Sequence, residues 1–496
     1  MNQTHPVIII GAGPIGLAAA AHLLERNQSF KVLEAGNAPG AAMSSWGHIK
    51  LFSTWRYNID NAARRLLETP TDAYAGQWVA PRETRLPNGA EMVTEYLAPL
   101  ASHPAMAPHI SYNSRVIAVT RVREDGKGVD KTSSANRATS HFLVRVQTSA
   151  GVEDHVARAV IDASGTWNQP NPVGRSGIEA IGETVAREAG FITSPLPDPQ
   201  GTDAERFAGK TVLVVGAGHS AANTLISLGR LRQQHPDTTI LWGLRGTANP
   251  VRLYGGGAAD ELPARGQLGT SLRRFVDNKD ITIVENLAIT KLETGDRLTI
   301  HLSDHTSRIV DFLVPATGFR PDLGILSELR LDMDQIVEAP RQLGPLIDPE
   351  FHSCGTVTAH GERVLSHPEP DFYIVGMKSY GRAPTFLMAT GYEQVRSITA
   401  ALAGDRAAAD LVELDLPETG VCSTDLGGSC DLPAPAQPAA SCGTPAPEAT
   451  QSASCGVPDP APAAADSCCG TPEPIKIGFA TGTLHGHTEL LTDKKS

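Results

Sequence analysis

Residues 7–26 read VIIIGAGPIGLAAAAHLLER, and this stretch decides the fold. The apolar, β-branched run VIII predicts a buried strand, and the strong helix formers after Gly16 predict a helix. Between them GAGPIG fits G-x-G-x-x-G, which in the order strand, turn and helix is typical of a dinucleotide-binding βαβ unit. Gly11 makes the turn, Gly13 lets a pyrophosphate approach the backbone, and Gly16 lets helix and strand pack closely. Pro14, inside the turn, joins them as a candidate binding residue.

The next predicted strand, FKVLE, ends at Glu34, 23 residues after Gly11. A carboxylate at this position can accept hydrogen bonds from both hydroxyls of an adenosine ribose, and it repels a 2′-phosphate. The alternative is an ordinary βαβ unit with a glycine-rich turn. Strand, spacing and acid together favour the nucleotide site.

The same order recurs at residues 211–230, TVLVVGAGHSAANTLISLGR. Here Ala221 stands for the third glycine, the small-residue variant of the pattern. The following strand, TTILWGLR, ends in Arg245 instead of an acid, and a guanidinium can pair with a 2′-phosphate in fork geometry. The alternative for Arg245 is a solvated surface charge. We predict a site that prefers NADPH to NADH, with candidate contacts from Gly216, Gly218, His219, Ser220, Ala221 and Arg245.

Two dinucleotide sites of opposite charge preference have a chemical meaning. One suits a resident FAD, the other suits the NADPH that reduces it, and the cofactors then carry the redox chemistry. The predicted fold class is α/β, with two Rossmann-like domains, one for FAD and one for NADPH, in a three-layer ββα architecture. We expect an FAD domain in two pieces, 1–170 and 310–412, an inserted NADPH domain at 171–309, and a tail at 413–496.

Composition excludes several classes of protein. The chain has 496 residues and a formal net charge of −12, so nothing indicates a binder of nucleic acid. No apolar run approaches the roughly 18 residues that span a bilayer. The start, MNQTHPVIIIGAG, has no basic region or cleavage site. We therefore expect a cytoplasmic protein without nucleic-acid or membrane partners that acts on a small molecule; the sequence leaves its oligomeric state open.

Further stretches within residues 1–405 carry a family resemblance. SSWGHIKLF (44–52), ASGTWNQPNP (163–172), ATGFRPD (316–322) and FYIVGMKSYGRAPTFLMATGYEQV (372–395), with GAGPIG, resemble the two-dinucleotide-binding-domain flavoproteins. Within these, the chain is similar to flavin-containing and Baeyer–Villiger-type monooxygenases. The resemblance implies further FAD contacts from Trp46, Val116, Ala163, Gly165 and Gly376. Body and tail together resemble bacterial flavoprotein monooxygenases associated with metalloid resistance.

The resemblance also implies a reaction. NADPH reduces FAD, and the reduced flavin reacts with O₂ to give a C4a-peroxyflavin that oxidises a small soft nucleophile such as sulfur, nitrogen or a metalloid. Lys50, Arg56 and Asn58 are the candidate catalytic residues beside the flavin, since a fixed charge from Lys50 or Arg56 would stabilise a developing anion. The alternative is that they belong to a packed loop.

Two motifs of related enzymes are missing from this chain. Flavin-containing monooxygenases carry F-x-G-x-x-x-H before the second glycine turn, but residues 191–210, FITSPLPDPQGTDAERFAGK, contain no histidine. Disulfide reductases of this architecture carry a cysteine pair beside the flavin, and no cysteine precedes Cys354. The first departure leaves oxygenation open, and the second excludes direct transfer from flavin to disulfide by that route.

The tail repeats one phrase three times, as SCGTPAP (441–447), SCGVPDP (454–460) and SCCGTPEP (467–474). Rich in proline and alanine and without aromatic residues, this segment is predicted to be disordered. Three interpretations remain open. The thiolates capture a thiophilic metal or metalloid and deliver it to the flavin, a vicinal pair exchanges electrons, or the tail is an inert linker. The candidate ligands are Cys442, Cys455, Cys468 and Cys469.

We therefore predict an FAD- and NADPH-dependent oxidoreductase, and favour a monooxygenase. The first alternative is an NADPH-dependent reductase of a metal, metalloid or disulfide that uses Cys468 and Cys469. The second is a flavin-based redox sensor. The sequence does not identify the substrate.

Overall fold

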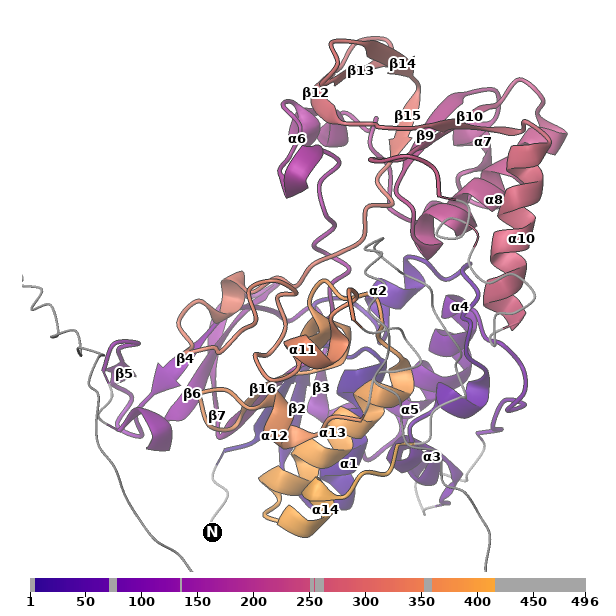
Figure 1. Ribbon diagram of the computed structural model, residues 1–496. Helices are drawn as coiled ribbons and strands as arrows, with labels where there is room; N and C mark the ends of the chain where they lie inside the picture. Colours follow the sequence, from indigo (N-terminus) through magenta and orange to yellow (C-terminus); the bar gives the residue numbers. More distant parts are fainter. Residues whose placement is uncertain are drawn as a thin grey trace, which may run out of the picture. The chain divides into compact units, whose positions relative to one another are not determined.

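The computed structural model describes residues 5–70, 78–133, 136–249, 254, 263–351 and 359–414 (Figure 1). The predicted ligands Cys442, Cys455, Cys468 and Cys469 lie outside these ranges, as does Cys354. Within the described residues, no helix is both long and apolar enough to cross a membrane.

The first sheet is parallel and has the order β16-β8-β1-β2-β3. The apolar run at the start of the sequence forms its central strand, and every residue is buried because other layers cover both faces of the sheet. Its strands are β1 (Val7–Ile10), β2 (Phe30–Leu33), β3 (Ile110–Ser111), β8 (Ala159–Asp162) and β16 (Phe372–Ile374).

Alternate side chains of β1 belong to two different cores, which gives three layers. Val7 and Ile9 pack with residues of α1 (Pro14–Glu25) and α13 (Met388–Leu402). Ile8 and Ile10 pack against a second, antiparallel sheet with the order β5-β4-β6-β7. Figure 1 shows α1 and α13 on the face of the parallel sheet opposite β4, β6 and β7. The strands of the antiparallel sheet are β4 (Arg115–Val122), β5 (Gly128–Val129), β6 (His141–Thr148) and β7 (Gly151–Ala157).

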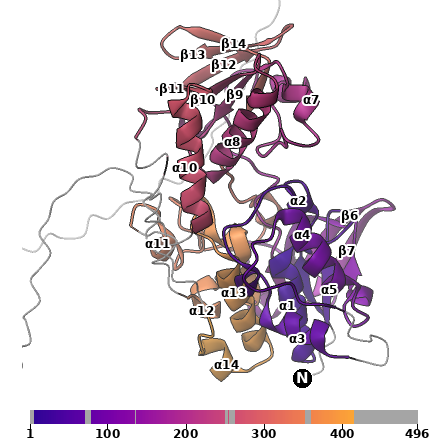
Figure 2. The same ribbon diagram turned by 90° about the vertical axis from the view of Figure 1, so that its right-hand side faces the viewer.

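The second parallel sheet repeats this plan with the order β11-β10-β9-β15. Val212 and Val214 of its central strand pack with α8 (His219–Gln234) and α10 (Pro263–Asp277), which lie side by side in Figure 2. Leu213 and Val215 face the opposite core, shared with the antiparallel strands β12 to β14. The strands are β9 (Thr211–Val215), β10 (Thr239–Gly243), β11 (Ile281–Val284), β12 (Ile289–Glu293), β13 (Leu298–Leu302), β14 (Ser307–Val310) and β15 (Phe312–Val314).

The remaining α-helices are short. They are α2 (Ala41–Ser44), α3 (Asn61–Glu68), α4 (Gly89–Glu91), α5 (Ala98–Ser102), α6 (Glu183–Glu188), α7 (Ala204–Phe207), α11 (Gly344–Ile347), α12 (Glu362–Leu365) and α14 (Arg406–Asp410).

The α/β class and the two Rossmann-like units are confirmed. The domain boundaries stay predictions, and one detail differs from them. β15 pairs with β9 in the second sheet, so this sheet extends to Val314, beyond the predicted boundary at 309. The reason is that β15 completes the second sheet before the chain crosses back to the first unit.

Candidate functional site: two nucleotide cradles

The first glycine turn leaves a hollow at the carboxyl end of β1. Gly11 has φ +101°, and a Cβ there would lie 2.9 Å from the carbonyl oxygen of Ala163. A Cβ on Gly16 would lie 2.0 Å from the carbonyl oxygen of Gly11, so helix and strand touch through backbone alone. A Cβ on Gly13, by contrast, would meet no atom within 4 Å. The open space thus lies where α1 begins, with Pro14 at its first turn, which is the place that holds the pyrophosphate in dinucleotide-binding folds.

Glu34 is held at the edge of this hollow by two backbone amides. The N–H of Ala12 donates to Oε2 at 2.7 Å, and the N–H of Gly36 donates to Oε1 at 2.7 Å. Each carboxylate oxygen retains a second lone pair, because a carboxylate has about four acceptor positions. The half-buried carboxylate is therefore oriented by the turn and can still accept bonds from a ribose.

The crossover after β8 and the turn after β16 close the hollow. Ala163 donates its N–H to Ile10 and Gly165 has φ +70° with open space around it. Gly376 has φ +66°, and its N–H donates to Oε1 of the buried Gln394 at 2.7 Å. These predicted FAD residues therefore lie at the ends of adjacent strands, as a shared cradle requires.

Two other predicted FAD residues lie deeper. Trp46 is half-buried and packs against Gly89, whose added Cβ would meet the indole at 2.9 Å. Val116 lies in β4, 7% exposed, in the core between the parallel and antiparallel sheets. Neither placement tests a contact with the cofactor.

A buried ion pair ties the crossover to the turn after β16. Lys378 donates from Nζ to Oδ2 of Asp162 at 2.6 Å and to Oγ of Ser164 at 3.1 Å. Ser164 donates from both N and Oγ to Oδ1 of Asp162, at 3.1 and 2.6 Å. The side chains of Lys378 and Asp162 are 1% and 0% exposed. Such a pair is costly to bury, so we read it as a clamp on the crossover Ala163–Gly165.

A buried hydroxyl lies near the start of α13 without a partner among the described residues. Thr385, 2% exposed, lies just before α13, and its Oγ1 has no hydrogen-bond partner in the described part of the chain. Buried hydroxyls are normally paired, so this atom is suited to a bond with a bound group. FAD bound in the first cradle would be held by the turn, by Glu34 and by the crossover, and it would supply the redox chemistry.

The second glycine turn repeats the first. Gly216 has φ +139°, and a Cβ there would lie 2.0 Å from the carbonyl oxygen of Ala316. A Cβ on Gly218 would meet nothing within 4 Å. Ala221 is fully buried against the sheet, whereas Ser220 is half-buried and His219, the first residue of α8, is exposed. The ring of His219 lies 5.0 Å, between centroids, from the ring of Phe52.

A small pocket of about 50 Å³, the β9 pocket, lies beside this turn. Arg245 and Arg382 both line it, and Arg245 is exposed and makes no ion pair with the described residues. Oδ1 of Asn171, also on its wall, is buried and has no hydrogen-bond partner among the described residues. The other lining residues are Pro172, Val173, Gly174, Gly177, Val215 and Thr317. Guanidinium groups beside a glycine turn favour a phosphate ligand.

The three candidate catalytic residues do not converge on one point. Lys50 is exposed, and its backbone forms an isolated antiparallel β-bridge with Asn88. Asn58 is fully buried, and its amide donates to the carbonyl oxygens of Ser53 and Thr54 at 2.8 and 2.9 Å. Its amide hydrogens thus hold their own loop. The exposed Arg56 lies over the Tyr57 ring, with its guanidinium carbon 5.5 Å from the centroid.

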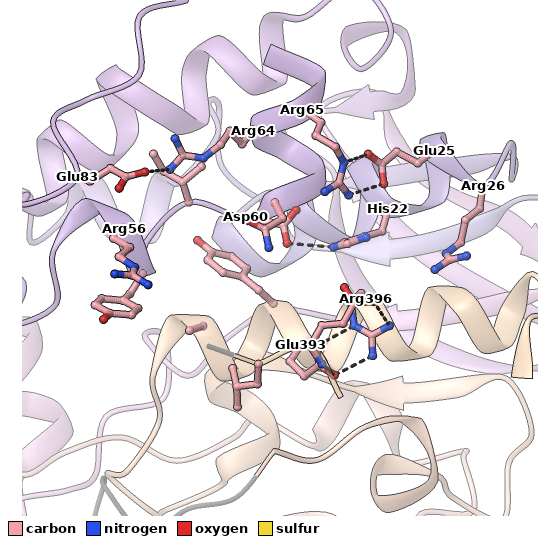
Figure 3. Close-up of a pocket in the computed structure, with 17 residues that line it drawn as sticks. His22, Glu25, Arg26, Arg56, Asp60, Arg64, Arg65, Glu83, Glu393 and Arg396 are labelled. Atoms are coloured by element: carbon pink, nitrogen blue, oxygen red, sulfur yellow. Dashed lines mark hydrogen bonds and ion pairs between the residues drawn. The ribbon is translucent and has the colours of Figure 1, made fainter. Parts of the chain in front are cut away.

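Arg56 lines a larger cavity of about 480 Å³, the α1–α13 cavity, shown in Figure 3. It lies between α1, the segment 56–65 and α13. On its wall, the hydroxyl of Tyr392 donates to the carbonyl oxygen of Asn58 at 2.8 Å, and burial raises the pKa of Tyr392 well above its usual range. The neutral hydroxyl therefore links α13 to the loop that carries Arg56.

No group of three or more His, Cys, Asp or Glu side chains arranged for a metal ion occurs among the described residues. The predicted thiol ligands in the tail lie outside those residues. The proposal of a thiophilic cargo therefore depends on the sequence alone.

Comparisons with known proteins agree with this geometry. Residues 9–78 match the family model described as an NAD(P)-binding Rossmann-like domain. Indole-3-pyruvate monooxygenase YUCCA1 of Oryza sativa subsp. japonica is 26% identical over 228 residues, 45% of this chain and 45% of that protein. The match thus spans less than half the length of this curated relative.

The fold is similar to that of the bacillithiol disulfide reductase Bdr (YpdA). For the protein from Bacillus cereus the TM-score is 0.57 and the identity 17%, covering 81% of this chain and 99% of that one. For the protein from Staphylococcus aureus the TM-score is 0.55 and the identity 16%, covering 82% and 99%. These likenesses show the fold alone.

Two dinucleotide cradles in one chain, the first with an acid at the end of β2 and the second with an arginine after β10, define the class. The chain thus has the two nucleotide cradles that characterise FAD- and NAD(P)H-dependent oxidoreductases. The predicted cofactors, FAD and NADPH, are confirmed.

Sequence reasoning missed the clamp formed by Asp162 and Lys378, and it assigned Arg382 no place in the second site. One signal was available, a lysine two residues after Gly376 in the mostly apolar run FYIVGMKSYG. A charged residue in such a run needs a buried partner. The partner, 216 residues earlier in the chain, had no signal of its own.

Proposed function

We propose that the protein is a flavin-dependent monooxygenase that uses NADPH and O₂ to oxidise a small soft nucleophile, a sulfur, nitrogen or metalloid centre. The observation that carries the proposal is the alignment of 228 residues with a protein named a monooxygenase. The absence of any cysteine before Cys354 supports it, since a flavin disulfide reductase needs a thiol relay beside the flavin. We further propose that Cys442, Cys455, Cys468 and Cys469 deliver thiophilic cargo.

In this proposal the chain's residues bind and orient the cofactors. The first turn and Glu34 hold FAD, and the second turn holds NADPH. Lys50 and Arg56 supply positive charge on the flavin side, and Asn58 positions the loop that carries Arg56. FAD, when bound, supplies hydride acceptance and reaction with O₂.

The first test is NADPH oxidation by the FAD-loaded full chain in air and under argon. Arsenite or dimethyl sulfide is added as the substrate to be oxidised, and arsenate or a small disulfide is added in separate runs as the acceptor to be reduced. We expect turnover that consumes O₂, rises with substrate, and stops under argon. Turnover under argon that is lost in Cys468→Ser/Cys469→Ser would contradict the oxygenase and favour a metalloid or disulfide reductase. If NADPH reduces the flavin but the reduced flavin passes its electrons neither to O₂ nor to an added acceptor, the result would favour a redox sensor.

Arg382 is proposed to select NADPH together with Arg245. Both line the β9 pocket, and Nη1 of Arg382 lies 3.7 Å from Oε1 of Glu338, a loose pairing that leaves donors available. Arg320 provides a matched comparison, because it bonds the same Glu338 through Nε and Nη2 but does not line the pocket.

We expect Arg382→Ala and Arg245→Ala each to weaken NADPH binding about 10- to 150-fold, the value of one or two charge-assisted hydrogen bonds. Isothermal titration with NADPH, NADH and 2′,5′-ADP measures this. If only the affinities for NADPH and 2′,5′-ADP fall, the arginine contacts the 2′-phosphate. If the affinity for NADH falls as well, the arginine contacts the pyrophosphate. If Arg320→Ala loses as much NADPH affinity as Arg382→Ala, the effect comes from Glu338, which both arginines contact. If Arg382→Ala and Arg245→Ala bind NADPH with unchanged affinity, neither arginine belongs to the site.

A further inference from the structure

The α1–α13 cavity belongs to neither cradle. It is lined by His22 and Glu25 near the end of α1 and by Arg26, which follows that helix, whereas FAD is proposed at the first turn of α1. Its volume of about 480 Å³ falls in the range of pockets that hold small molecules. Figure 3 shows charged side chains on all sides of it.

Part of this charge is neutralised inside the wall. His22 Nε2 lies 3.0 Å from Oδ2 of Asp60, and these side chains are 5% and 3% exposed. Arg396 donates from Nε and Nη2 to both oxygens of Glu393 at 2.8 Å, in a pair equally buried. Buried pairs of this kind contribute little to stability, because the cost of desolvation offsets their attraction. Asp60 also caps α3 by accepting from the N–H of Ala63, and Arg396 also donates to the carbonyl oxygen of Ala408, so these pairs shape the wall and leave binding to the other cations.

Two of the remaining cations, Arg26 and Arg64, are more deeply placed than two of the remaining carboxylates, Glu83 and Glu413. The side chains of Arg26 and Arg64 are 24% and 22% exposed, and the carboxylate oxygens paired with them are no closer than 3.5 Å. The carboxylates left at the rim, Glu83 and Glu413, are 58% and 51% exposed. The anions can turn to solvent while the guanidinium groups stay, so the interior presents positive charge and unused donors.

We propose that the α1–α13 cavity binds a small polyanion, a molecule with at least two carboxylate or phosphate groups. Arg26, at the end of α1, and Arg64, on α3, each bind one acidic group, and Arg56 lines the same cavity from a third element. Guanidinium groups match both carboxylate and phosphate in geometry, so the two chemistries share one site. Because the ligand would join the end of α1 to α3, it would stabilise the packing of these two helices in the core they share.

The test uses the FAD-loaded full chain with excess NADP⁺, so that FAD occupies the first cradle and NADP⁺ the second. Citrate and inorganic pyrophosphate are then each titrated into the protein in a calorimeter. We expect saturable binding with a Kd below about 1 mM for at least one probe. Citrate alone would assign a carboxylate ligand, pyrophosphate alone a phosphorylated one, and both a general polyanion site. Arg26→Ala and Arg64→Ala should each weaken binding about tenfold or more.

Two control variants test whether the probes bind in the α1–α13 cavity. Arg145 forms an exposed bidentate pair with Asp154 far from any lining residue, so Arg145→Ala should bind the probes as the unchanged protein does. Arg245→Ala should also leave binding unchanged. The proposal is overturned if neither probe binds, if Arg26→Ala and Arg64→Ala bind normally, or if Arg245→Ala alone abolishes binding.

Discussion

Replacement of Gly13 by alanine is expected to leave the protein folded and to weaken FAD binding by about 5- to 150-fold. An added methyl at this position would meet no protein atom within 4 Å, and the backbone is extended at φ −79°, so the chain itself tolerates alanine. The methyl would instead occupy the space that the pyrophosphate needs. Overpacking typically costs about 1–3 kcal/mol, which corresponds to this range of affinity.

The measurement is FAD retention after dialysis, together with a Kd for FAD from flavin fluorescence and a thermal midpoint for the apoprotein. Gly128→Ala is the matched control, because Gly128 also has nothing within 4 Å of an added Cβ but lies in β5, away from both cradles. Gly218→Ala should keep FAD and lose NADPH affinity by the same steric argument. A Gly13→Ala protein that retains FAD as tightly as Gly128→Ala would place the cofactor elsewhere.

The glycine turns could be predicted because their determinants are local. Strand, turn and helix succeed one another within twenty residues, and Glu34 and Arg245 follow at the end of the next strand. The structure adds that the crossovers pack directly on the turns, with Ala163 on Gly11 and Ala316 on Gly216. That repeated contact explains why ASG and ATG segments follow strands β8 and β15.

The β9 pocket and the α1–α13 cavity could not be predicted in this way. Arg382 and Arg245 are far apart in sequence, and nothing local to either residue indicates that they line one pocket. The same holds for Arg26 and Arg64, which lie on different helices. The bonding of Asn58 could not be predicted for a related reason. Its position suggested the flavin loop, but its amide is used to hold that loop, a detail that depends on the fold of residues 53–58.

Replacement of Lys378 by methionine is expected to cost about 3–5 kcal/mol of the free energy of unfolding, because it leaves the carboxylate of Asp162 buried without its counter-charge. The loss should extend to FAD, since Asp162 also holds Ser164 in the crossover that packs on Gly11. Urea unfolding of the FAD-loaded protein and FAD retention are the measurements. Arg145→Met, which breaks an exposed pair, should cost less than about 1 kcal/mol.

The double variant Lys378→Met/Asp162→Asn separates the role of the charge from the role of the crossover. Asparagine is neutral, but its carbonyl oxygen can still accept the two bonds from Ser164, so most of the stability lost in Lys378→Met should return. FAD retention should return with it if the pair acts by holding the crossover. If stability returns but FAD is still lost, the charge of Lys378 itself acts on the cofactor. If Lys378→Met alone costs no more than the exposed-pair control, the clamp is not a determinant of the cradle, and the glycine turn must hold the crossover through its backbone contacts alone.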